Sequence, residues 1–238
     1  MLSDIEITQA TKLIPIDKLA HDAGLEDAEF EPYGRDKAKV ELNPSRQIRA
    51  RLILVTATSG MPAGSGKTTT SIALAQGLKR LGFQTTIALR EPSLGPVFGM
   101  KGGAAGGGYS QVLPMEAINL HFTGDFHAIT SANNLLAALV DNARHQGQIV
   151  LKEIFWRRVM DVNDRMLRNI VTGLGGTANG IPTETGFDIT VASELMAVLC
   201  LATDMEDLRA RLDRIVVGTR PDGTACLLYT SDAADDRI

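Results

Sequence analysis

A glycine-rich turn between two apolar runs constrains the fold more than any other feature of this sequence. Residues 51–56, Arg-Leu-Ile-Leu-Val-Thr, form a short apolar run, which predicts a strand buried on both faces. Behind the turn, leucines recur at helical spacing over residues 74–81, and Gly82 stands where a C-terminal cap belongs. A second apolar run, residues 85–90, follows. Strand, loop, helix and strand in this order predict a βαβ unit, and therefore a parallel sheet.

The turn itself carries the residue types that hold phosphate. Its glycines let backbone N–H groups point inward at an anion, and Lys67 supplies positive charge for the outer phosphates. The Thr68 hydroxyl follows, where a ligand for Mg²⁺ is needed. The strict motif has glycine where this chain has Met61, so the motif is a variant, and a merely tight strand–helix turn is the alternative interpretation. The residues predicted to bind nucleotide are Pro62, Ala63, Gly64, Ser65, Gly66, Lys67, Thr68 and Thr69.

The rest of the chain alternates between helical and strand-like patterns. Residues 91–109 are too rich in glycine and proline for regular structure, and the stretch 102–108 predicts a loop whose backbone approaches another group closely. One or two helices are expected within residues 1–43, further helices over 131–144, 161–171, 193–201 and 203–214, and strands over 187–191 and 215–217. The alternation indicates an α/β fold, with a P-loop NTPase-like, mostly parallel sheet flanked by helices.

Charged residues follow the second predicted strand. Arg90 and Glu91 stand at its carboxyl end, which is where open α/β sheets bind their ligands. An arginine at this place can grip a carboxylate or an acyl phosphate with two hydrogen bonds. Alternatively, Arg90 and Glu91 form an exposed ion pair, and Asp125, further along, is an ordinary turn acid.

Long strings of this sequence are more specific than the phosphate loop. The stretches 90–112, 119–136, 163–165 and 186–194 resemble the formate–tetrahydrofolate ligases, also called formyltetrahydrofolate synthetases. The resemblance extends from near the start of the chain to about Thr219. It identifies the chain as similar to the N-terminal part of such an enzyme, truncated before the C-terminal domains that carry the pterin-binding aromatic residues.

The resemblance implies a reaction and a role for each candidate residue. Members of this family join formate to tetrahydrofolate with ATP, by way of formyl phosphate, in one-carbon metabolism. By resemblance, Lys67 binds the triphosphate, Thr68 lies near Mg²⁺, and Arg90 binds formate and then steadies formyl phosphate. Glu91 and Asp125 resemble the acids near a monovalent-cation site that takes potassium or ammonium. The implied substrates are formate and tetrahydrofolate, and the implied assembly is a homotetramer.

Three positions depart from the family pattern. Ser65 stands where the family usually has glutamate, Met61 where threonine is common, and Ala117 where an aspartate is usual. The first two leave the geometry of the phosphate loop possible, but they put its affinity for nucleotide in question.

Two boundaries and two other functions follow from the same reasoning. Residues 1–225 are expected to form the ATP-binding domain, with the start of a second subdomain after about residue 140. Residues 226–238 are expected to be an unstructured tail, which is either foreign to the gene or a short natural terminus.

A P-loop switch ATPase of the partition or metal-delivery kind is an alternative function, although such a protein needs neither Arg90 nor the glycine-rich stretch. An inactive truncation is the third possibility.

Composition and charge indicate which partners, metal sites and compartment to expect. The formal net charge of −4 argues against nucleic acid as a partner, and two cysteines without a paired motif argue against a disulfide framework or a zinc site. No secretory signal and no membrane-spanning run are recognised, so a cytoplasmic protein is expected. His121 and His127 match no helical metal-ligand spacing and are expected in loops or the core, while Trp156 is expected to pack rather than to stack on folate.

Overall fold

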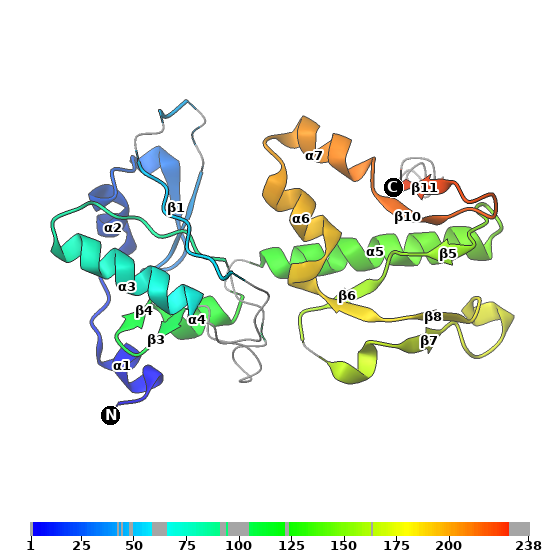
Figure 1. Cartoon of the computed structure of the whole chain (residues 1–238), viewed down its shortest axis with the longest axis horizontal. Helices are drawn as coiled ribbons and strands as arrows, with labels where there is room; N and C mark the ends of the chain where they lie inside the picture. Colours follow the sequence, from blue (N-terminus) through cyan, green and yellow to red (C-terminus); the bar gives the residue numbers. More distant parts are fainter. Residues whose placement is uncertain are drawn as a thin grey trace. The chain divides into compact units, whose positions relative to one another are not determined.

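A computed structural model of the chain describes residues 2–41, 43, 45–47, 50–58, 66–90, 94, 105–121, 124–162 and 164–228. The chain divides into two compact units, Met1–Phe122 and Thr123–Ile238. Each unit is described by itself below, and Figure 1 shows the elements of both.

The first unit combines short helices with two small hairpins around one longer helix. The helix α1 begins behind a capping box in which the Ser3 side chain and Glu6 satisfy each other's backbone N–H groups. Helix α3 carries Ile72, which is buried where the helix packs on strands β3 and β4. The elements of this unit are α1 (Asp4–Ala10), α2 (Ile16–Asp22), a 3₁₀ turn (Asp27–Glu29), β1 (Phe30–Pro32), β2 (Ala38–Val40), α3 (Lys67–Arg80), β3 (Gly106–Gly107), β4 (Ser110–Gln111) and α4 (Met115–Asn119). Strands β1 and β2 pair antiparallel, as do β3 and β4.

The second unit is built around one long helix, α5. A three-stranded antiparallel sheet of order β11-β10-β5, a parallel pair β6–β9 and an antiparallel pair β7–β8 accompany it. Its helices are α5 (Asp125–His145), α6 (Glu194–Leu201) and α7 (Met205–Leu212), with 3₁₀ turns over Arg165–Leu167, Thr177–Asn179 and Thr190–Ala192. Its strands are β5 (Glu153–Ile154), β6 (Arg158–Met160), β7 (Ile170–Thr172), β8 (Thr183–Thr185), β9 (Phe187–Ile189), β10 (Val216–Thr219) and β11 (Ala225–Leu227).

The core of the second unit lies between α5 and the three-stranded sheet. Val140 of α5, Val217 of β10 and Cys226 of β11 are almost completely buried and belong to one apolar cluster. Trp156 joins this cluster, and its indole N–H donates to the backbone carbonyl of Asn133 at 3.1 Å. Because a buried indole needs an acceptor, this bond fixes how the segment before β6 lies on α5. The prediction that Trp156 packs is confirmed.

The outer edge of the parallel pair is covered by a helix rather than by a third strand. The side chain of Asn134, in α5, donates to the Val159 carbonyl at 3.0 Å and accepts from the Val159 N–H at 2.8 Å. The neighbouring Asn133 donates to the Arg157 carbonyl at 2.9 Å. These amides occupy the groups through which β6 would pair with a further strand, so the parallel sheet stops at two strands on this side.

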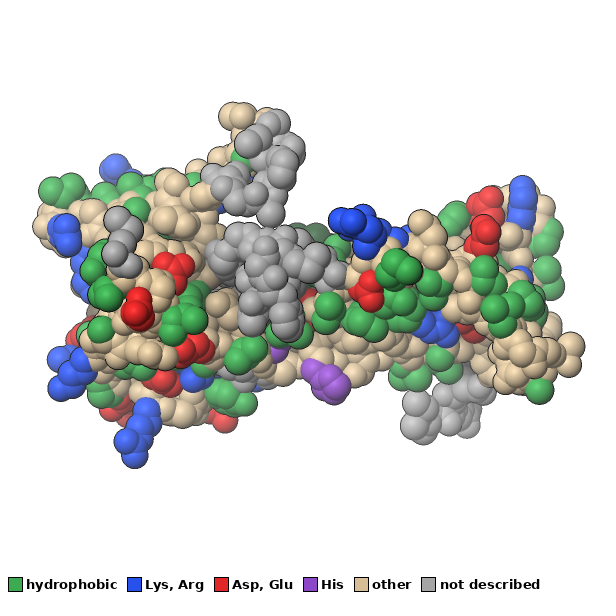
Figure 2. Space-filling model, turned by 90° about the horizontal axis from the view of Figure 1, so that it is seen from below, with side chains coloured by type: hydrophobic (Ala, Val, Ile, Leu, Met, Phe, Trp, Pro, Cys, Tyr) green, Lys and Arg blue, Asp and Glu red, His purple; other side chains and the backbone are tan. Residues whose placement is uncertain are grey.

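The α/β class is confirmed, but the described residues show no P-loop-like, mostly parallel sheet. Apart from β6–β9, the pairs in the described part of the chain are antiparallel. The predicted strands over residues 51–56 and 85–90 have no regular secondary structure and belong to no sheet, and Leu52 is 94% exposed. A run of apolar residues becomes a strand only beside a partner that takes its backbone hydrogen bonds, and no described strand pairs with either segment. On the face of the molecule drawn in Figure 2, hydrophobic side chains are visible among polar and charged ones.

Helix predictions were right where the apolar period is helical over several turns. Helix α3 contains the predicted segment except its last residue, Leu81, which is the C-cap, and Gly82 behind it has the left-handed φ of +89° expected at such an end. Helices α5 and α6 and strand β10 also lie where the sequence placed them. The predicted helix over 161–171 was wrong, because the β-branched residues 170–172 pair with β8 instead. The predicted strand over 187–191 ends at Ile189, where a 3₁₀ turn begins.

The last described residues correct the expected boundary of the tail. Cys226 is fully buried in β11, and Leu227 pairs with Val216 of β10. The unstructured tail therefore does not begin at Cys226, because this residue completes the core of the second unit. Residues 229–238 lie outside the described residues. Among the helices of the described part, none is long and apolar enough to cross a membrane.

Candidate functional site

The start of α3 has the features of an anion-binding helix end. Gly66 takes a left-handed φ of +75° and turns the chain into the helix, which begins at Lys67. The first intrahelical hydrogen bond runs from the Thr70 N–H to the Gly66 carbonyl at 2.9 Å, so the N–H groups of Thr68 and Thr69 precede the ladder. No side chain caps this end and no acidic residue stands in the first turn. An anion placed here meets both oriented N–H groups and the positive end of the helix dipole.

Half of the predicted nucleotide-binding residues lie at this helix end. Lys67 and Thr69 are exposed, and Thr68 is half-buried with its hydroxyl one residue behind the lysine. This donor set fits a phosphate with an associated Mg²⁺, because it offers an ammonium group, backbone N–H groups and a hydroxyl. The other predicted contacts, Pro62, Ala63, Gly64 and Ser65, lie outside the described residues, as does Met61.

The acids and the arginine of the prediction are not brought together within one unit. Arg90 is exposed at the end of the extended segment after α3, in the first unit. Asp125 is exposed at the first position of α5, in the second unit, directly after Gly124 with its φ of +80°. Glu91 lies outside the described residues. The monovalent-cation site at Glu91 and Asp125 therefore stays a prediction.

A feature that the sequence did not predict is the anchoring of the glycine-rich segment. Its described residues, Ala105–Gly108, include strand β3 of the β3–β4 hairpin, and this hairpin packs on α3. A Cβ on Gly106 would lie 2.0 Å from the Ser110 carbonyl oxygen and 2.6 Å from the Ile72 side chain, so the position requires glycine. The sequence signal was present in Ile72 and Gln76, which are four residues apart and therefore share one face of α3.

Polar side chains hold the hairpin from both sides. From α3, Gln76 donates to the Tyr109 carbonyl at 2.9 Å and accepts from the Ser110 hydroxyl at 3.3 Å. From α1, the Asp4 carboxylate accepts from the Gly108 N–H at 2.8 Å. Gln111 returns the contact by donating to the Asp4 carbonyl at 3.2 Å. The hairpin is thus held between the first helix of the chain and the helix that begins at Lys67.

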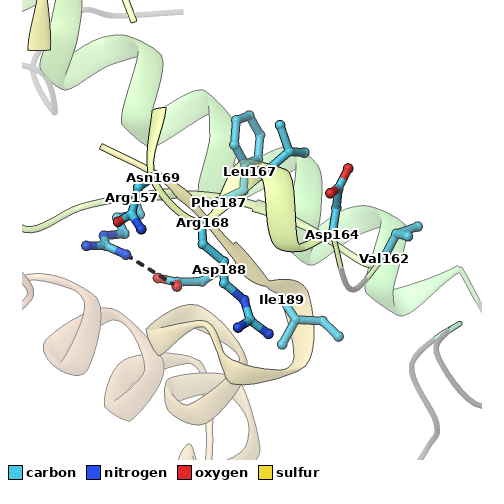
Figure 3. Close-up of a pocket in the computed structure, with 9 residues that line it drawn as sticks. All are labelled: Arg157, Val162, Asp164, Leu167, Arg168, Asn169, Phe187, Asp188 and Ile189. Carbon is cyan, nitrogen blue, oxygen red and sulfur yellow. Dashed lines mark ion pairs between the residues drawn. The ribbon is translucent and has the colours of Figure 1, made fainter. Parts of the chain in front are cut away.

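A separate open cavity of about 340 Å³ lies in the second unit (Figure 3). Two arginines and two aspartates give it a balanced charge, and Arg157 pairs with Asp188 at 3.8 Å. Its walls come from the ends of β6, the 3₁₀ turn behind it and strand β9. The residues that line it are Arg157, Val162, Asp164, Leu167, Arg168, Asn169, Phe187, Asp188 and Ile189. No residue of the predicted nucleotide, formate or cation sites is among them.

His121 and His127, the two histidines considered as metal ligands, belong to different units. His121 follows α4 in the first unit with a left-handed φ of +55°, and His127 is exposed on α5 in the second unit. Across the described ranges, no three His, Cys, Asp or Glu side chains gather closely enough to hold a metal ion.

Comparison with known proteins decides the family. A family model described as formate–tetrahydrofolate ligase matches residues 2–233. The chain belongs to the formate–tetrahydrofolate ligase family. The formate–tetrahydrofolate ligase of Hyphomonas neptunium is 60% identical over 225 residues, and that of Paracoccus denitrificans is 57% identical over 225. The enzyme of Limosilactobacillus fermentum is 57% identical over 223 residues.

Each alignment covers 92% of this chain and 40% of the relative. The chain therefore spans less than half the length of these formate–tetrahydrofolate ligases. The predicted resemblance of the chain to this family is confirmed.

Proposed function

We propose that this chain carries the ATP- and formate-binding part of a formate–tetrahydrofolate ligase. The observation that carries the proposal is the start of α3, where Gly66 turns the chain and Lys67 stands beside oriented N–H groups. A chain of this family needs such a place for the phosphates of ATP, and the helix end fits them by charge and by its donors. In the complete ligase, ATP, formate and tetrahydrofolate give 10-formyltetrahydrofolate, ADP and phosphate by way of formyl phosphate.

The nucleotide is held by residues 62–69. The backbone N–H groups of Thr68 and Thr69 donate to phosphate oxygens, and the ammonium group of Lys67 neutralises the charge that builds up on the transferred phosphoryl group. The Thr68 hydroxyl would be a ligand of Mg²⁺, which would supply positive charge to the phosphates when it is bound. Serine at position 65, in place of the usual glutamate, removes one negative charge next to the phosphates.

Formate is bound by Arg90. Its guanidinium group matches a carboxylate with two parallel hydrogen bonds and then holds the more negative formyl phosphate in the same way. Glu91 and Asp125 provide carboxylate oxygens for a potassium or ammonium ion. Both units are proposed to belong to the ATP-binding region of the ligase, with the P-loop-like parallel sheet as a feature of that larger protein. The complete protein acts as a homotetramer in the cytoplasm, and the two free thiols support a reducing compartment.

The proposal is tested on the nucleotide site first. Replacing Lys67 by alanine removes a charge-assisted hydrogen bond, so the Kd for Mg·ATP should rise roughly 10- to 100-fold in calorimetric titration. Lys79→Ala is the matched control on the same helix. It lies twelve residues further on, about 18 Å along the axis and about two Debye lengths away at physiological salt, so its Kd should stay within about two-fold of the wild type.

The reaction itself needs a second measurement. ADP release from ATP should depend on formate, and the dependence should be compared with and without tetrahydrofolate. If Lys67→Ala and Lys79→Ala weaken ATP binding equally, the phosphates do not bind at the start of α3. If the chain binds ATP but its ADP release ignores formate, the ligase assignment of this chain's site is wrong.

A further inference from the structure

We propose that the open cavity beside strands β6 and β9 binds a small organic carboxylate with an apolar body, through the guanidinium groups of Arg168 and Arg157. The inference goes beyond the proposed function, because no residue of the nucleotide, formate or cation sites is among those that line this cavity. It concerns a second binding site, within the second unit.

The cavity lies at an edge of the structure where ligands commonly bind. Strands β6 and β9 are parallel, Val162 follows the end of β6, and Ile189 is the last residue of β9. Both residues line the cavity, so it reaches the edge at which the two parallel strands end, and open α/β sheets bind their ligands at that edge. Its volume of about 340 Å³ is close to the lower limit of roughly 300 Å³ for small-molecule sites. The cavity therefore suits a compact organic molecule.

The charged side chains of the cavity leave one arginine without an acidic partner. Asp164 caps the 3₁₀ turn behind β6, where its carboxylate accepts from the Met166 N–H at 2.8 Å. Asp188 lies 3.8 Å from Arg157, which is longer than the roughly 2.7–2.9 Å of a charge-assisted hydrogen bond. In the described part of the chain, the guanidinium group of Arg168 has no hydrogen-bond or ion-pair partner. Its N–H donors are therefore available to an anion that enters the cavity.

Close backbone packing fixes the place from which Arg168 extends. A Cβ on Gly186 would lie 2.1 Å from the Arg168 carbonyl oxygen, so the two segments touch directly. The Arg168 N–H donates to the Arg165 carbonyl at 3.4 Å and closes the 3₁₀ turn. In Figure 3 the guanidinium groups of Arg157 and Arg168 lie on either side of the Asp188 carboxylate. A ligand carboxylate in this opening can accept from both arginines.

The acids and the apolar walls narrow the class of anion. Because Asp164 and Asp188 repel negative charge, an anion with a single charge is less costly to place here than a phosphate with nearly two. Leu167, Phe187 and Ile189 are half-buried and form an apolar wall, against which a ligand can bury apolar surface. Formate has no part that could reach this wall. The cavity is thus complementary to a carboxylate that carries a ring or a branched apolar group.

The test is a titration of the intact chain with 3-phenylpropanoate, followed by two-dimensional NMR of the backbone amides. The amide signals of Leu167, Arg168, Asp188 and Ile189 should shift, with a Kd of about 1 mM or below. Arg168→Met keeps the length of the side chain but loses its donors, so the Kd should rise at least about ten-fold. Arg209→Met is the matched control, because Arg209 is exposed on α7 outside the cavity, and its Kd should stay within about two-fold of the wild type.

Asp188→Asn gives a readout that a merely structural role would not move. It removes the acid that competes for Arg157 and repels the ligand, so the Kd for 3-phenylpropanoate should fall by about three-fold or more. Two probes each lack one part of the proposed ligand. The corresponding alcohol, 3-phenylpropan-1-ol, lacks the charge, and formate lacks the apolar body, so both should bind this cavity at least about ten-fold more weakly.

An unchanged Kd in Arg168→Met, or an equal loss in Arg209→Met, would overturn the inference. The same holds if the cavity amides do not respond to 3-phenylpropanoate, or if inorganic phosphate binds there as tightly. The proposed function is tested separately, since Arg168→Met should leave the Kd for Mg·ATP unchanged. A chain that binds no Mg·ATP would overturn the proposed function and leave this inference standing, because the two sites share no residue.

Discussion

Two asparagines of α5, Asn133 and Asn134, cover the edge of β6. The stability of the second unit should depend strongly on the half-buried Asn134. Asn134 is in the middle of α5, where asparagine is a poor helix former, yet its side chain makes both hydrogen bonds that a neighbouring strand would give to Val159. Val159 is only 3% exposed, so water cannot replace the lost partners. Replacing Asn134 by alanine should therefore cost far more than a typical surface substitution.

The size of the loss follows from the groups left behind. Asn134→Ala leaves two buried backbone groups, the Val159 N–H and the Val159 carbonyl, without a partner, at a cost of about 1–2 kcal/mol each. Alanine recovers a few tenths of this through its better helix propensity. The free energy of unfolding should fall by about 2–4 kcal/mol, a large part of the roughly 5–15 kcal/mol that stabilises a domain.

The assay is urea unfolding followed by the fluorescence of Trp156, the single tryptophan of the chain, which is buried in this unit. A loss of this size lowers the urea midpoint by about 1–3 M. Asn142→Ala is the control, because Asn142 is exposed on the same helix, and its effect should stay within about 0.5 kcal/mol. If Asn134→Ala unfolds at the wild-type midpoint, the side chain does not hold β6 and the explanation of the two-stranded sheet fails.

Two further predictions concern the close backbone contact at Gly186 and the hydrogen-bonded carboxylate of Asp207. A Cβ at Gly186 would lie 2.1 Å from the Arg168 carbonyl oxygen. Gly186→Ala should therefore destabilise the second unit by about 1–3 kcal/mol in the same urea assay. Gly77→Ala, with open space around it, should instead stabilise α3 by up to about 1 kcal/mol. A hydrogen bond from Arg211, together with the Thr203 N–H, lowers the pKa of Asp207, so the stability that this carboxylate contributes should persist at neutral pH and be lost only as the pH falls below about 3.9. Carbon NMR titration should place the Asp207 midpoint below that value, and Arg211→Gln should raise it. An Asp207 midpoint at or above the ordinary value would contradict the stabilisation of this carboxylate by Arg211 and the Thr203 N–H.

Helices could be predicted from this sequence because their evidence is local. The leucines of α3 and the cap at Gly82 are contained in one stretch of chain, and hydrogen bonds within the helix need no distant partner. The same holds for α6, whose N-cap Ser193 accepts from the Met196 N–H at 3.2 Å. Helix α7 lies inside the predicted range 203–214, and its N-cap Asp204 accepts from the Asp207 N–H at 2.8 Å.

Strands were harder, because a strand is defined by a partner that the local sequence does not show. Residues 51–56 have the composition of a buried strand, but they remain exposed where nothing described pairs with them. Residues 170–172 sit in a stretch that looks helical by spacing, but they pair with β8. Both errors come from reading composition without the pairing that decides it.

The candidate site shows the same difference between features that the local sequence determines and features that depend on distant residues. The turn at Gly66 and the start of a helix at Lys67 could be predicted because the motif is contiguous and its helix forms locally, and the binding of phosphate there stays a prediction. The contacts of Gln76 were missed because its hydrogen-bond partners lie in a hairpin more than thirty residues away, and an exposed glutamine on a helix gives no signal by itself. In this chain, a contiguous phosphate-type motif can be recognised in the sequence, whereas the side chains that hold the β3–β4 hairpin on α3 emerge only from the folded chain.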